Sequence, residues 1–211
     1  MICNFYEVVD AMATERKADR RVAYTKLALR EALIKLMQDQ HISGITVKSI
    51  CDLADVNRST FYLHYRDQYD LLKQIEQEVM ASVRERLLQA PTSLADEADV
   101  SGIGPITLEA MTKILEYAKE NADLARVLLS ENCDYAFQHD IMELTQLVAL
   151  LPNGSLDARM RDYIVTYGIN GCVALAEKWL KEGTVEEPAD FAKLILQVLY
   201  FGTSSFARER K

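Results

Sequence analysis

The sequence predicts an all-α fold, in which an N-terminal three-helix helix-turn-helix domain precedes a larger helical domain. The chain has 211 residues but only 4 prolines and 8 glycines, which leaves few turn residues for an all-β fold. Apolar residues recur at helical spacing along most of the chain, and no strand-like alternation of useful length occurs. After the first long apolar helix face come two short helical segments joined by a tight turn.

The first domain begins with an apolar helix face that is interrupted at Gly44. Its members are spaced i, i+3, i+4, i+7 and i+8, and they are Leu29, Ala32, Leu33, Leu36 and Met37. Thr46 can cap a short second helix. The residues of that helix expected to point inward are Val47, Ile50, Leu53 and Ala54. Asp55 occupies the turn, because aspartate tolerates a left-handed backbone better than most residues. Asn57 can then cap a third helix, Arg58 to Tyr65.

The rest of the chain is also helical in pattern. A fourth helix is expected from Asp67 to Gln89, with an apolar stripe made of Tyr69, Leu72, Ile75, Val79, Val83 and Leu87. The stretch Ala90 to Pro105 holds two prolines and two glycines and indicates a linker. Further helical patterns cover Ile106 to Glu120, Ala122 to Ser130, Asp134 to Leu151, Leu156 to Glu182 and Ala189 to Ala207. Pro188 suits the first turn of the last helix. We therefore expect a domain of residues 14–66, preceded by an extension of residues 1–13, and a second domain of residues 67–211.

Charge is distributed unevenly along the chain. The formal net charge is −8, which by itself argues against binding to nucleic acid. From Arg16 to Lys73, however, eleven Lys/Arg and seven Asp/Glu give about +4, whereas the chain from Glu76 onward carries about −9. A basic segment on an acidic body favours a protein that holds phosphate groups at one end only.

The segment Thr46 to Tyr65 reads TVKSICDLADVNRSTFYLHY and matches a helix-turn-helix unit. Ile50, Leu53 and Val56 are expected to hold the second helix against the third, with Phe61 packed behind them. This leaves a set of outward residues that would face a DNA major groove, namely Asn57, Arg58, Ser59, Thr60, Tyr62 and His64.

Within this set, the first turn of the third helix is the part nearest to base edges, and it holds Arg58, Ser59 and Thr60. A second group is placed for phosphate contacts, namely Thr46, Lys48, Tyr62 and Tyr65. Of the two tyrosines, we expect one to pack in the core and the other to bind a phosphate. Double-stranded DNA is therefore the predicted partner.

From about Leu29 to Leu72 the chain shows an apolar first helix, an I-T-V opening and the run S-T-F-Y-x-H-Y before D-L-L. This pattern resembles the DNA-binding domain of the TetR family of transcriptional regulators. Three positions depart from it. Cys51 replaces a usual Ala, Asp55 replaces a usual turn Gly, and Gln68 stands where the family often has a lysine that contacts phosphate.

The second half is similar to the C-terminal domain of regulators related to dihydroxyacetone kinase control, over Tyr117–Asn121, Leu128–Phe137 and Gly168–Leu180. The family resemblance implies a homodimer, in which the last two helices of each subunit form a four-helix interface. Gly168 and Gly171 would allow close helix approach there, although packing inside one subunit explains them equally well. Candidates for an effector pocket, each a core residue first, are Met111, Tyr117, Phe137, Met142, Tyr163 and Tyr167.

These features favour a regulator, most simply a repressor, that binds a palindromic operator as a homodimer and responds to a small-molecule effector. The alternative is a regulator whose C-terminal domain docks a partner protein. An enzyme is not expected, because no G-x-S-x-G, H-E-x-x-H or glycine-rich phosphate loop occurs. No cofactor or metal is expected either, since no two Cys or His residues lie three or four positions apart. The sequence has no membrane-length apolar run and no basic signal region, so we expect a cytoplasmic protein.

Overall fold

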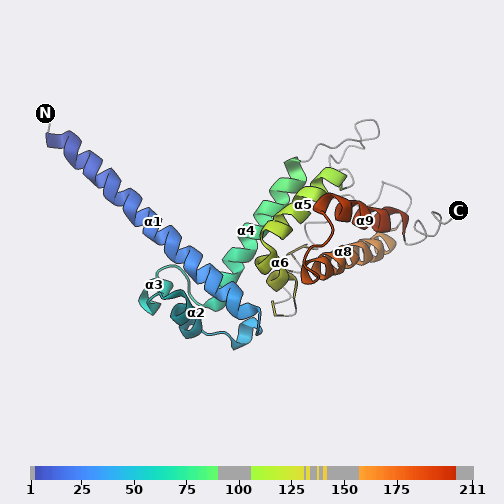
Figure 1. Ribbon diagram of the computed structural model, residues 1–211, viewed down its shortest axis with the longest axis horizontal. Coiled ribbons are helices and arrows are strands. Elements are labelled where there is room, and N and C mark those ends of the chain that lie inside the picture. The colour runs from blue at the N-terminus through green and yellow to red at the C-terminus, as the bar shows by residue number, and fades with distance from the viewer. Residues whose placement is uncertain are drawn as a thin grey trace. The chain divides into compact units, whose positions relative to one another are not determined.

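A computed structural model describes residues 3–89, 106–130, 132–133, 137, 140–141 and 157–202. Every element within these ranges is a helix, which confirms the predicted all-α fold (Figure 1). The chain divides into two units, Met1–Ile75 and Glu76–Lys211, and the division falls within helix α4 (Gln68–Gln89).

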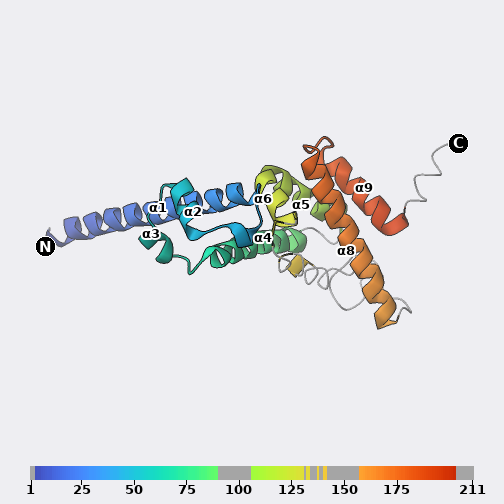
Figure 2. The ribbon, with the colours of Figure 1, turned by 90° about the horizontal axis from the view of Figure 1, so that it is seen from below.

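The first unit begins with α1 (Cys3–Met37), whose last turns carry the predicted buried face. Leu29 and Leu33 are fully buried and Met37 is 1% exposed. A short 3₁₀ turn, η1 (Ile42–Gly44), leads to α2 (Val47–Ala54) and α3 (Arg58–Tyr62), and α2 packs on α1. The third helix ends three residues before the predicted Tyr65. Both views show α2 and α3 beside the C-terminal half of α1 (Figures 1 and 2).

One inward residue of α2 was predicted wrongly. Leu53 is 43% exposed, whereas Ile50 is fully buried and Cys51 is 3% exposed. At 100° per residue, positions 47, 50, 51 and 54 share one face of an eight-residue helix, and position 53 lies about 110° from the middle of that face. The inward position predicted for Leu53 therefore belongs to the smaller Cys51, and the side chain of Leu53 lies on the exposed side of α2.

The second unit packs α5 (Leu108–Glu120) against α9 (Pro188–Phe201), and α6 (Ala122–Leu129) against α8 (Ala158–Lys181). Pro188 occupies the first turn of α9, as predicted. The predicted linker Ala90 to Pro105 and most of the predicted helix Asp134 to Leu151 lie outside the described residues.

The core of this unit is built around Trp179, which is 2% exposed. Its indole stacks on Phe191 with ring centroids 5.0 Å apart, and its Nε1–H donates to the carbonyl of Glu186 at 3.1 Å. The cluster joins α5, α8 and α9 through Met111, Leu115, Trp179, Leu180, Phe191, Ala192 and Ile195. Aromatic stacking and the satisfied N–H together stabilise this contact.

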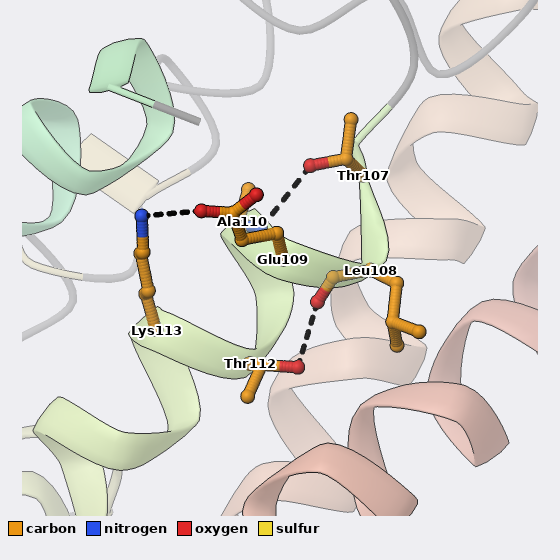
Figure 3. Close-up of polar contacts among 6 residues, drawn as sticks. All are labelled: Thr107, Leu108, Glu109, Ala110, Thr112 and Lys113. Carbon is orange, nitrogen blue, oxygen red and sulfur yellow. Dashed lines mark hydrogen bonds and ion pairs between the residues drawn. The ribbon is translucent and has the colours of Figure 1, made fainter. Parts of the chain in front are cut away.

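Helix α5 starts from a well-formed cap (Figure 3). The backbone N–H of Ala110 donates to Thr107 Oγ1 at 3.1 Å, and Lys113 Nζ lies 2.6 Å from Glu109 Oε1 one turn later. The Thr112 hydroxyl donates to the Leu108 carbonyl at 2.7 Å. Capping of this kind contributes about 1 kcal/mol and fixes where the helix begins.

Candidate nucleic-acid interface

Helix α2 is fixed at its start by a reciprocal capping box. The backbone N–H of Ser49 donates to Thr46 Oγ1, and the backbone N–H of Thr46 donates to Ser49 Oγ, both at 3.1 Å. Thr46 remains exposed. Lys48 is also exposed and forms no ion pair with any residue of the described chain, so its ammonium group is available to a phosphate.

The turn between α2 and α3 depends on Asp55. Its backbone has φ 53° and ψ 44°, the left-handed conformation that the sequence predicted at this position. Its N–H donates to the carbonyl of Cys51, and the N–H of Val56 donates to the same carbonyl at 3.0 Å. A left-handed backbone costs an L-residue about 1–2 kcal/mol, less for aspartate, and here it turns the chain directly into α3.

The first turn of α3 is capped by Asn57. Its Oδ1 accepts from both the backbone N–H and the hydroxyl of Ser59, each at 2.9 Å. These two polar side chains therefore hold each other in the free protein. Arg58 is exposed, and Thr60 is half-buried beside it.

Phe61 is fully buried and holds α3 in place from the side opposite its exposed residues. Its ring contacts Tyr62 edge-on at 5.6 Å and Tyr65 at 5.5 Å between centroids. Tyr65 is only 6% exposed, whereas Tyr62 is 58% exposed. His64 is half-buried, with its ring 6.2 Å from that of Tyr65. The two tyrosines thus lie in different environments, with Tyr62 presenting its ring to solvent.

Two ionisable groups near this surface have shifted pKa values. Burial raises the pKa of the Cys51 thiol, and the nearby Arg58 guanidinium opposes the rise, so the thiol stays protonated. The pKa of Asp70 is lowered, mainly because its carboxylate accepts the backbone N–H of Arg66 at 2.9 Å. The Asp70 N–H in turn donates to Asp67 Oδ1, which caps the start of α4.

Sequence reasoning left unassigned one group of side chains in this unit. Arg20, Arg21 and Lys26 are exposed on α1, and Tyr24 is 74% exposed among them. The sequence signal for this group is the run of positive charge that begins at Arg16.

The candidate pocket residues of the described ranges lie in several different surroundings. Met111 lies in the Trp179 core and Phe137 is 3% exposed. Tyr117 is half-buried, and the Arg86 guanidinium lies over its ring, with Cζ 4.2 Å from the ring centroid. Tyr163 and Tyr167 are 55% and 74% exposed. Met142 lies outside the described residues.

The second unit also carries an open groove of about 390 Å³ between α5 and α9. It is lined by Leu108, Lys193, Leu196, Gln197 and Phe201. Among the described residues, no cluster of His, Cys, Asp or Glu could hold a metal ion. No helix in those ranges has the length and apolar character needed to cross a membrane.

Residues 107–200 match a family described as the transcriptional regulator C-terminal region, TetR_C_8. The chain is 22% identical over 171 residues to an uncharacterized HTH-type transcriptional regulator, YxbF, of Bacillus subtilis (strain 168). That match covers 81% of this chain but 43% of YxbF, so the chain spans less than half the length of this curated relative.

Solved structures show the same fold. A TetR transcriptional regulator from Streptococcus agalactiae 2603V is 24% identical, with a TM-score of 0.60 over 88% of this chain and 98% of its own. The fatty acid degradation regulator FadR from Bacillus halodurans is 13% identical, with a TM-score of 0.59 over 85% and 96% of the two chains. The dihydroxyacetone kinase operon activator DhaS is 18% identical, with a TM-score of 0.50 over 86% and 97%.

Proposed function

We propose that the chain is a transcriptional regulator of the TetR type, which binds a palindromic DNA operator as a homodimer and acts as a repressor. The observation that carries this proposal is the exposed first turn of α3, held by the Asn57 cap and the buried Phe61. Residues 14–66 form the DNA-binding domain, residues 67–211 form the regulatory and dimerisation domain, and the protein works in the cytoplasm.

The proposed contacts follow the exposure of each side chain. Arg58, with Thr60 beside it, reads base edges in the major groove. Asn57 and Ser59 join this contact once their mutual hydrogen bonds open. Phosphate contacts come from Thr46, Lys48 and Tyr62, and His64 lies at their edge. Tyr65 supports them, because its buried ring fixes the position of α3.

Lys48→Ala tests the phosphate contact. Since this lysine is exposed and unpaired among the described residues, its loss should weaken binding to every duplex sequence alike. The slope of log affinity against log salt should become shallower by about one unit. Fluorescence anisotropy with duplexes of different sequence measures both quantities. An affinity that does not respond to salt in the wild-type protein would contradict DNA binding through this surface.

The homodimer proposal is supported by an exposed apolar stripe on α8. Met160, Tyr163, Ile164 and Tyr167 recur at helical spacing and are all at least 36% exposed. Gly171 continues the stripe one turn later, and a Cβ added there would meet no atom within 4 Å. Gly168 is buried instead. The open space at Gly171 suits close approach by a second helix, together with the exposed Phe201 of α9. Trp179 does not belong to this surface, because it lies in the core.

We also propose that an effector binds in the second unit and changes the distance between the two α3 helices of the dimer. Helix α4 would transmit the change, since it begins in the first unit and continues into the second. A mostly apolar or neutral polar small molecule is expected. The open groove lined by Leu108 and Phe201 favours the second candidate, a partner protein that docks on the outside of this domain.

Thermal-shift screening of metabolites, with and without duplex DNA, separates these candidates. A true effector should stabilise the protein, and DNA should change its affinity by the same factor by which the effector changes DNA affinity, typically about 5–150-fold. Stabilisation that DNA leaves unchanged would contradict coupling. The absence of any stabilising metabolite would favour the partner protein.

A further inference from the structure

Helix α1 carries an exposed basic strip, defined here as Arg20, Arg21 and Tyr24. The three residues share one face, because Tyr24 follows the two arginines at i+4 and i+3. Neither arginine forms an ion pair with a residue in the described ranges, and Tyr24 is 74% exposed. The sequence carries two more bases, Arg16 and Lys17, one helical turn earlier in α1.

The strip lies outside the packed part of the first unit. The buried face of α1 begins at Leu29, about 14 Å along the helix axis from Arg20. Both views show α2 and α3 beside the C-terminal half of α1, while the N-terminal half of the helix continues past them (Figures 1 and 2). The strip therefore lies on the part of α1 that precedes its buried face, where its side chains are open to solvent.

Unpaired, adjacent arginines on a protein of net charge −8 do not stabilise the fold, since no described carboxylate neutralises them. A polyanion neutralises such a pair directly, through charge-assisted hydrogen bonds to phosphate oxygens. An exposed tyrosine hydroxyl adds a neutral donor of the type that commonly contacts DNA phosphates. Among polyanions, the duplex that α3 is proposed to read is the one that the same unit of the chain would already hold.

We infer that the basic strip binds phosphate groups of the same duplex that α3 reads, and so extends the DNA contact beyond the helix-turn-helix. This inference rests on the proposed function. It assigns Arg20, Arg21 and Tyr24 to the interface, while the residues before the basic run, 1–13, remain outside it.

The test uses the full chain and a fluorescein-labelled duplex of mixed sequence, about three helical turns long. Arg20→Ala/Arg21→Ala should bind at least about tenfold more weakly at low salt, with a salt slope shallower by about 1.8 for two lost phosphate contacts. Between about 50 and 200 mM salt, the affinity ratio of wild type to variant should then fall about 12-fold. Arg20→Lys/Arg21→Lys should restore most of the affinity, because phosphate binding needs charge rather than a planar fork.

The matched control is Lys113→Ala/Arg126→Ala, which removes the same two charges from exposed ion pairs of the second unit. It should leave the slope unchanged, whereas an equal loss would mean that only net charge matters and would overturn the inference. Deleting residues 1–13 should keep affinity within about threefold, and deleting residues 1–21 should reproduce the double-alanine loss.

Failure of the inference is distinct from failure of the proposed function. If Lys48→Ala weakens binding while Arg20→Ala/Arg21→Ala matches wild type at every salt concentration, the helix-turn-helix binds DNA and the strip does not. If the wild-type chain fails to bind any duplex, both proposals are wrong.

Discussion

Tyr167→Glu combined with Phe201→Glu is expected to make the protein monomeric and to weaken operator binding by about 10²–10⁴-fold. Both side chains are more than 70% exposed in the single chain, so the substitutions should leave the protomer folded. In the proposed dimer each would bury an unpaired carboxylate in an apolar interface, which costs several kcal/mol. A monomer then binds one half-site at a time and loses the gain from simultaneous engagement.

Light scattering coupled to size exclusion measures the mass, and anisotropy with a palindromic duplex measures the affinity. Val185→Glu is the matched control, because Val185 is 77% exposed and lies between α8 and α9, outside both helices. It should leave a dimer of wild-type affinity. A double-glutamate protein that stays dimeric would show that other surfaces form the interface.

Arg58→Ala is expected to cost about 1–3 kcal/mol of operator binding and to relax the preference at one base pair. The side chain is exposed at the first turn of α3, and the fold does not depend on it. Affinity for a mixed-sequence duplex should change much less, since that binding depends mainly on phosphate contacts.

The informative control is Arg58→Lys. It keeps the positive charge but loses the bidentate fork, so it should bind mixed sequence like the wild type and still lose base preference. A gel-shift series on single-base operator variants measures the preference. Unchanged preference in both variants would assign base reading to other residues.

Much of the first unit was predictable because its signals are local. The α1 face, the Thr46 and Asn57 caps and the turn at Asp55 each depend on a few adjacent residues, and all appear as expected. The prediction that Leu53 points inward was wrong, because it followed from the apolar character of leucine and not from the angle of position 53 around the helix. The roles of Tyr62 and Tyr65 could be divided but not assigned, since their burial depends on how Phe61 packs.

The second unit was less predictable because its important contacts join segments far apart in the sequence. Tyr163 and Trp179 have the same aromatic character on one helix, yet one is exposed and the other buried. Only the packing of α9 on α5 and α8 distinguishes them, and no spacing rule within α8 reports it.

The only tryptophan of the chain makes the second unit optically separable from the first. Trp179 is enclosed beside Phe191, so its emission should shift to longer wavelength only when that core opens to water. Helical circular dichroism, by contrast, reports both units together. The unfolding transitions measured by the two signals will therefore coincide if both units unfold cooperatively. They will separate if the first unit unfolds independently.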